Sequence, residues 1–110
     1  MKISYQKKKL KTSLNDASEI KKKYGVNAKR VARRIAEITA APNLATLIQI
    51  PAANCHSLSG KRKNEWALDV SKNDRLIFEI DHDPIPLLDN NSIDTKMVTS
   101  ICVVEIVDYH

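Results

Sequence analysis

The apolar run near the end of the chain constrains the fold more than any other feature of the sequence. Between Val98 and Val107, apolar side chains occupy both alternating positions of an extended chain. Such a strand is typical of the interior of a sheet covered on both faces, because exposing either face would bring apolar side chains into water. The run is far shorter than the roughly 20 apolar residues that span a bilayer. We therefore predict a central strand over 98–107, buried on two sides.

Chain size limits what can be built around that strand. The 110 residues, 43% hydrophobic and 28% charged, match one small globular domain covering 1–110. A core of this size leaves no room for a large ligand cavity, so we expect no cofactor. The N-terminus lacks the apolar stretch of a signal peptide, and Cys55 and Cys102 lack the spacing of a disulfide framework. We expect a soluble, cytoplasmic protein with reduced thiols.

Two helices are predicted in the first half of the chain. The first covers 17–24, with Asn15 or Asp16 as its N-terminal cap. The second begins at Ala28, keeps apolar residues three and four positions apart, and ends before Pro42, which cannot continue a helix. The opposite face of this second helix is basic, so the pair has one packed side and one electropositive side.

The strands complete the order β-α-α-β-β-β. Segments in which apolar and polar residues alternate predict strands, and the interrupted polar stretch before the apolar run predicts a loop. Strands are expected at 3–5, as an edge strand, and at 65–70, 75–80 and 98–107, with a further short one at 55–58 and a long loop over 81–97. The pattern predicts an α+β domain, in which two N-terminal helices pack on one face of an antiparallel sheet and the other face stays partly open.

Charge is distributed unevenly along the chain. Residues 1–63 carry 15 Lys and Arg against 3 Asp and Glu, whereas residues 64–110 carry 3 against 10. A basic half of this density favours RNA, DNA or a ribosome as partner, because phosphate binding releases counterions. A lysine-rich surface that serves only solubility is the alternative. The candidate RNA- or ribosome-binding residues are Lys7, Lys8, Lys9, Lys29, Arg30, Arg33, Arg34, Lys61, Arg62 and Lys63.

Three segments, taken in order, carry a family resemblance. They are Cys55–Trp66 (CHSLSGKRKNEW), Asn73–Phe78 (NDRLIF) and Glu105–His110 (EIVDYH). Together they resemble the HigB branch of the RelE/ParE toxin superfamily, and its killer-type plasmid maintenance subgroup in particular. The resemblance implies a RelE/ParE-like fold and a type II toxin that enters the ribosome and cuts translated messenger RNA. It also implies a separate helix-turn-helix antitoxin of the HigA type as partner.

The resemblance places the catalytic candidates on a few positions only. Members of the branch have a His-x-Leu-x-Gly stretch before a basic turn, an Arg followed by apolar and aromatic residues, and a closing Asp-Tyr-His. Three departures from the family pattern stand out: Ser59 stands where Lys is frequent, the acidic residue that the family often has near Lys61 is missing, and Asp74 stands where an aromatic residue is frequent. The catalytic candidates carried over in this way are His56, Arg75, Asp108, Tyr109 and His110, with Lys61 and Arg62 in the matching basic turn.

These residue types suit RNA cleavage without a metal. The ribose 2′-hydroxyl attacks the adjacent phosphorus, which requires a base for that hydroxyl, an acid for the departing 5′-oxygen and cations for the phosphate. Histidine serves both proton transfers because its ordinary pKa is near 6.5. We assign His56 and His110 as this pair, with the order of their roles left open. Asp108 would orient or charge one imidazole, Tyr109 would contact a phosphate or a base, and the cations would stabilise developing charge.

Each interpretation has a simpler competitor. A gyrase-inhibiting toxin of the ParE type, or a non-catalytic nucleic-acid-binding module, would also explain the basic half of the chain. His56 could be a half-buried histidine bonded to the backbone, and Arg75 could merely pair with Asp74 or Glu79. The last three residues could be a frayed end. A zinc site built from Cys55, His56, Cys102 and His110 lacks the spacing of known sites.

Overall fold

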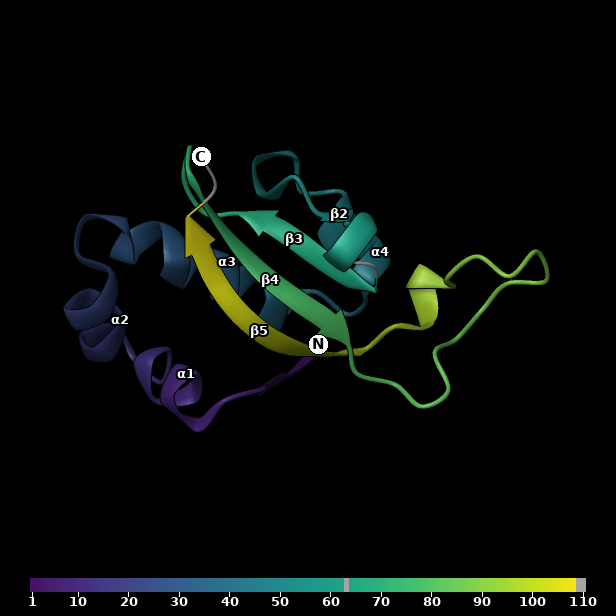
Figure 1. Ribbon diagram of the computed structural model, residues 1–110, viewed down its shortest axis with the longest axis horizontal. Coiled ribbons are helices and arrows are strands. Elements are labelled where there is room, and N and C mark those ends of the chain that lie inside the picture. The colour runs from purple at the N-terminus through teal and green to yellow at the C-terminus, as the bar shows by residue number, and fades with distance from the viewer. Residues whose placement is uncertain (63, 109–110) are drawn as a thin grey trace.

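A five-stranded sheet forms the framework of the protein. The computed structural model describes residues 1–62 and 64–108, and its strands pair in the order β1-β5-β4-β3-β2 (Figure 1). The strands are β1 (Lys2–Tyr5), β2 (His56–Ser57), β3 (Glu65–Asp69), β4 (Asp74–Ile80) and β5 (Ser100–Asp108). The predicted α+β class and the predicted edge position of the first strand are confirmed. The sheet is mixed rather than antiparallel, because β1 runs parallel to β5 at that edge.

Four α-helices occur in the described part of the chain. They are α1 (Lys8–Ser13), α2 (Ala17–Tyr24), α3 (Ala28–Ala40) and α4 (Leu44–Ile48). Helix α3 packs on one face of the sheet, and α2 packs against α3. The helices predicted at 17–24 and from 28 onward are confirmed, whereas α1 was not expected, because Leu10 is its one large apolar side chain and gives no helical periodicity. In Figure 1, α3 lies behind the sheet and the opposite sheet face is turned to the viewer. None of the helices in the described part of the chain is long and apolar enough to span a bilayer.

Local chemistry defines where α2 begins and ends. The Asp16 carboxylate accepts a hydrogen bond from the Glu19 N–H at 2.9 Å, which selects Asp16 over Asn15 as the cap. Gly25 follows the helix at φ +54°, a conformation that strains residues with a β-carbon. Asn27 stands at the cap position of α3, but its side-chain amide donates instead to Asp74 Oδ2 at 2.8 Å. That bond ties the start of α3 to the turn between β3 and β4.

The core lies between α3 and the sheet. Val31 and Ile38 of α3 are fully buried against Leu76, Phe78 and Val103 of the central strands, as the helical and alternating patterns predicted. Trp66 belongs to the same cluster, and its ring stacks on that of Phe78 with centroids 6.3 Å apart. Alternation along β3 and β4 therefore turns the side chains between these core residues towards the other face of the sheet.

The strand predicted over 98–107 is present as β5, but its predicted burial on two sides is wrong. Ile101 and Val103 are fully buried, while residues 104–107 are only half-buried. Of these, Glu105 and Val107 lie on the open face, which the helices do not cover. The ladder also shifts register between Ile77 and Phe78, where β5 contributes one extra residue.

Residues 81–97 form the predicted long loop, which projects from one end of the sheet (Figure 1). Within it, Leu87 and Ile93 make an isolated bridge, and Thr95–Met97 forms a single 3₁₀ turn. His82, at the base of the loop, is half-buried, and its Nε2 accepts a hydrogen bond from the Thr99 N–H at 3.0 Å. This histidine therefore has a structural partner within the loop region.

Candidate active site on the open sheet face

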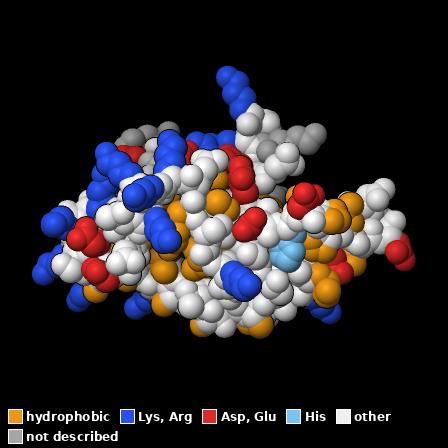
Figure 2. Space-filling model, turned by 90° about the horizontal axis from the view of Figure 1, so that it is seen from below, with side chains coloured by type: hydrophobic (Ala, Val, Ile, Leu, Met, Phe, Trp, Pro, Cys, Tyr) orange, Lys and Arg blue, Asp and Glu red, His pale blue; other side chains and the backbone are white. Residues whose placement is uncertain are grey.

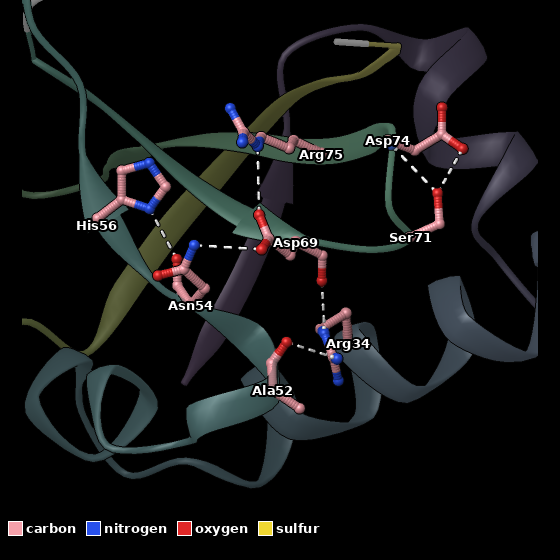
Figure 3. Close-up of polar contacts among 8 residues, drawn as sticks. All are labelled: Arg34, Ala52, Asn54, His56, Asp69, Ser71, Asp74 and Arg75. Carbon is pink, nitrogen blue, oxygen red and sulfur yellow. Dashed lines mark hydrogen bonds and ion pairs between the residues drawn. The ribbon is translucent and has the colours of Figure 1, made fainter. Parts of the chain in front are cut away.

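The open sheet face carries two of the predicted catalytic residues. His56 pairs with Ala67, and Arg75 pairs with Asp69 across the β3–β4 ladder. Directly paired residues share a face, and positions two apart on one strand do as well. His56, Asp69 and Arg75 therefore lie together on the face away from the helices, and Figure 3 shows them in one group. The structure thus brings together two positions that are 19 residues apart in the sequence.

The imidazole of His56 is held through one ring nitrogen. Its Nδ1 lies 2.7 Å from the main-chain oxygen of Asn54. A carbonyl oxygen only accepts hydrogen bonds, so Nδ1 must carry the proton. In the neutral ring the lone pair then resides on Nε2. The geometry leaves His56 with the nitrogen that a general base requires, while its other nitrogen is bonded to the backbone.

Asn54 adopts an unusual backbone conformation that makes this contact. It follows the 3₁₀ turn Pro51–Ala53 and has φ 46° and ψ 50°, in the left-handed region. Asparagine tolerates this region better than most residues with a β-carbon. Its side-chain Nδ2 donates to Asp69 Oδ2 at 3.2 Å. Both the main chain and the side chain of Asn54 are thus engaged with the site.

Asp69 connects the two candidate catalytic residues. Its Oδ1 accepts from Arg75 Nε at 3.2 Å, while its Oδ2 accepts from Asn54 (Figure 3). Asp69 was not among the partners that the sequence suggested for Arg75, which were Asp74 and Glu79. The main-chain oxygen of Asp69 accepts from Arg34 Nε at 2.7 Å. Asp69, at the end of β3, therefore contacts Arg75, Asn54 and Arg34 of helix α3.

Arg34 is a correction to the predicted RNA-binding set. Only 7% of its surface is exposed, because position 34 falls on the same helix face as the core residues Val31 and Ile38. Besides bonding Asp69, its guanidinium donates to the Ala52 carbonyl at 3.0 Å and pairs with Glu37 at 2.7 Å. The guanidinium is therefore bonded within the protein, and from the helix side it holds Asp69, whose side chain lies on the open face.

Asp108 lies on the opposite side of the sheet from His56 and Arg75. Its paired residue on β4 is Asp74, whereas Arg75 pairs with Val107. Asp108 and Asp74 both line a cavity of about 250 Å³ on the helix side, together with Tyr24 and Asn27 among others. The predicted catalytic residues Tyr109 and His110 lie outside the described residues. Asp108, the last described residue of β5, therefore pairs with the neighbour of Arg75, and its side chain points to the opposite sheet face.

The basic turn crosses the open face rather than standing apart from it. It forms the 3₁₀ turn Gly60–Arg62, and Arg62 pairs with Glu65 at 2.8 Å and with Glu105. These carboxylates belong to β3 and β5, so the guanidinium bridges over β4 between them. Hydrogen bonding to Glu105 is the main cause that raises the pKa of Arg62 above its usual value. Lys61 is exposed at the same turn, and Lys63 lies outside the described residues.

The remaining basic candidates are exposed and lie mainly at one end of the molecule. Figure 2 shows Lys and Arg side chains gathered at the end built from α1 and α2, and acidic side chains around the projecting loop at the other end. The asymmetry along the sequence is therefore also an asymmetry in space. The exposed members of the predicted set in this region are Lys7, Lys8 and Lys9 at the start of α1, and Lys29, Arg30 and Arg33 on α3.

Thiol chemistry does not contribute to the site. Cys55 is buried, and this burial raises the pKa of its thiol to about 12, which keeps it protonated and unsuited to metal binding at neutral pH. Both cysteines are free thiols. Across residues 1–62 and 64–108, no group of three or more His, Cys, Asp or Glu side chains is arranged to hold a metal ion.

Sequence reasoning missed Asn54 and Asp69. A weak signal exists for each, because Asn54 follows a proline-initiated turn and Asp69 is a carboxylate that closes an otherwise apolar strand segment. Neither signal identifies a partner, since the pairing of β2 with β3 and of β3 with β4 is what brings them to the histidine and the arginine.

Two comparisons with known proteins found a match, one in sequence and one in fold. A sequence profile of the family described as RelE-like toxin of type II toxin-antitoxin system HigB matches residues 3–94. A solved structure, a YoeB/ParE toxin from Agrobacterium tumefaciens, superimposes with a TM-score of 0.55, with all of both chains covered, at 10% sequence identity. At that identity the likeness concerns the fold alone. No curated protein sequence matches this chain.

Proposed function

Because the chain belongs to the HigB-like family of RelE-like type II toxins, we propose that it is a metal-independent endoribonuclease that cuts messenger RNA in the ribosome. A type II toxin is paired with a protein antitoxin, and we infer a helix-turn-helix antitoxin of the HigA type for this one. Its target places the reaction in the cytoplasm, where translating ribosomes are found. The exposed lysines and arginines of α1 and α3 would contact ribosomal RNA, and the open sheet face would receive the message.

The supporting observation is the state of His56 on the open face. Its Nδ1–H is donated to Asn54, so the neutral ring offers Nε2 as a proton acceptor on the face that also carries Arg75. The open face thus offers two of the three kinds of group that cleavage of a ribose-phosphate linkage requires, a base and a cation.

Each proton has an assigned place in the proposed reaction. Nε2 of His56 takes the proton of the 2′-hydroxyl as the 2′-oxygen bonds to phosphorus. The bond from phosphorus to the 5′-oxygen breaks, and that oxygen leaves with a proton supplied by His110. The products are a 2′,3′-cyclic phosphate and a free 5′-hydroxyl, while Arg75 stabilises the charge on the non-bridging oxygens.

The C-terminal residues are part of this proposal. We assign Tyr109 a contact with the bound RNA, as base stacking or a bond to phosphate. Asp108 faces the helix side, so we assign it to anchoring the end of β5, where Tyr109 and His110 begin, and give it no proton transfer.

The decisive experiment compares two histidines by the same substitution. His56→Gln should lower message cleavage on purified ribosomes by about 10²- to 10⁴-fold, the usual contribution of a positioned acid or base. His82→Gln is the matched control, because His82 sits in the projecting loop with Thr99 as partner and should leave cleavage unchanged. Primer extension on the message locates the cuts.

A substrate with sulfur in place of the 5′-oxygen separates the two roles. A thiolate leaves without a proton, so this substrate should restore cleavage by His110→Ala but not by His56→Gln. Rescue of the His56 variant instead would reverse the assignment. Full toxicity of the His56 variant in cells, or DNA breaks with intact message, would reject the nuclease and favour the gyrase-directed class.

A further inference from the structure

Two residues outside the family motif, Asn54 and Asp69, contact the candidate catalytic residues. Asn54 contacts His56, Asp69 contacts both Asn54 and Arg75, and none of these bonds needs the other face of the sheet. The contacts form one continuous chain from the imidazole to the guanidinium, visible as the dashed lines of Figure 3. Such a chain determines where two reacting groups lie relative to each other before RNA arrives.

The first link acts on the imidazole. A neutral histidine in water exchanges between two forms, with the proton on Nδ1 or on Nε2, and only the first has its lone pair on Nε2. The Asn54 carbonyl selects that form, and it meets the ring while residue 54 is in the left-handed conformation. A residue that disfavours this conformation would turn the carbonyl away.

The second link acts on the arginine. Asp69 binds Arg75 through Nε, the guanidinium nitrogen nearest the stem of the side chain. This bond orients the planar group without itself occupying the two terminal nitrogens. The second oxygen of the same carboxylate holds the Asn54 amide, and Arg34 holds the Asp69 main chain. Movement of Asp69 would therefore displace both candidate catalytic groups together.

We propose that Asn54 and Asp69 are positioning residues, Asn54 by setting the proton of His56 on Nδ1 and Asp69 by fixing Asn54 and Arg75 in one frame. The part that concerns catalysis rests on the proposed nuclease function, whereas the part that concerns the histidine proton is measurable without any RNA.

The Asn54 test uses two substitutions that differ in backbone freedom. Asn54→Ala disfavours the left-handed conformation, and Asn54→Gly accepts it. Nitrogen-15 NMR of the neutral His56 ring should show the proton on Nδ1 in the wild-type protein and in Asn54→Gly, and a shift towards Nε2 in Asn54→Ala. Cleavage should fall about 10- to 100-fold in Asn54→Ala, as for other partners that orient a histidine, and by a smaller factor in Asn54→Gly.

The Asp69 test has a matched control in the same hairpin. Asp69→Asn leaves one carbonyl oxygen where two donors need acceptors, so cleavage should fall about 10-fold or more. Asp74→Asn also changes a carboxylate with two side-chain donors, Ser71 and Asn27, but on the helix side, and should leave cleavage unchanged. In a double-mutant cycle, Asp69→Asn should cost clearly less when Arg75 is already Ala, because Asp69 acts partly through that arginine.

The outcomes separate this inference from the function on which it builds. A wild-type protein that cleaves no message, but keeps the His56 proton on Nδ1 and loses it in Asn54→Ala, rejects the nuclease and leaves the positioning of His56 standing. A cleaving wild-type protein whose Asn54→Ala variant retains both the Nδ1 proton and full activity overturns the inference. Circular dichroism of every variant checks folding. If Asn54→Ala fails to fold, the His56 proton and the cleavage rate are measured in Asn54→Gly instead.

Discussion

Arg34 is a buried polar residue whose replacement should lower stability. Its guanidinium satisfies two main-chain carbonyls, of Asp69 and Ala52, and pairs with Glu37. Arg34→Lys keeps the charge but not the planar set of donors, so at least one of these part-buried carbonyls loses its partner. We expect a loss of about 1.5–3 kcal/mol in the free energy of unfolding by urea titration. Arg33→Lys, at the exposed neighbouring position, should change it by less than about 0.5 kcal/mol.

Cys55 makes folding stability depend on pH in the alkaline range. Burial raises the pKa of its thiol from 9.0 to about 12 in the folded protein. The unfolded chain therefore releases this proton first, and stability that is present below pH 9 is lost as pH rises towards 12. At pH 10 this group should cost the wild-type protein about 1.4 kcal/mol relative to pH 8. Urea titrations should show this extra loss in the wild-type protein relative to Cys55→Ala, and parallel curves for the two proteins would contradict the assignment.

Residue chemistry in the sequence indicated part of the site. His56 and Arg75 were predicted because each lies in a short motif, and the structure places both on the open face. Asn54, Asp69 and the inward direction of Arg34 were not predicted. Their roles depend on which strands pair and in which register, and residue type and local spacing do not carry that information.

At the scale of elements, α2 depends on its cap. The Asp16 carboxylate accepts the Glu19 N–H, one of the donors that a helix start leaves without a partner. Asp16→Ala should cost about 1 kcal/mol of unfolding free energy, measured by thermal or urea denaturation. Asp16→Asn keeps the accepting oxygen and should recover most of the loss. Equal losses in both variants would show that the negative charge at the helix start, rather than the hydrogen bond, stabilises α2.

Elements bounded by clear capping or helix-breaking residues could be predicted, but the way the elements pack together could not. Caps and breakers such as Asp16 and Pro42 gave helices close to α2 and α3. The helix α1 carries too few apolar residues to show a period, and its folding depends on the neighbouring β1 and α2 instead. The parallel pairing of β1 with β5 joins the two ends of the chain. Contacts between positions so distant in sequence leave no local pattern, so the sheet was expected to be antiparallel.

At the scale of the whole molecule, folding turns a sequence asymmetry into two charged ends. The lysine-rich end is built from α1 and α2, and acidic residues gather around the projecting loop 81–97 (Figure 2). A long-range field of this kind orients the protein towards a polyanion during approach, and it acts most strongly at low salt. The orientation matters for the proposed function, since the open face must reach the message while the basic end meets ribosomal RNA.

The salt dependence of ribosome binding tests whether this end is an interface or only a solvated surface. Each phosphate contact contributes about 0.7–0.9 to the slope of log affinity against log salt concentration. Replacing Lys7, Lys8 and Lys9 by Ala should weaken binding and lower that slope by about 2–3, because all three are exposed at the start of α1. Lys72→Ala combined with Lys96→Ala, in the acidic half, should leave the slope unchanged. An unaltered slope in the triple variant means that these lysines contact no phosphate, and the bound RNA must then be held by α2, by α3 or by the open face.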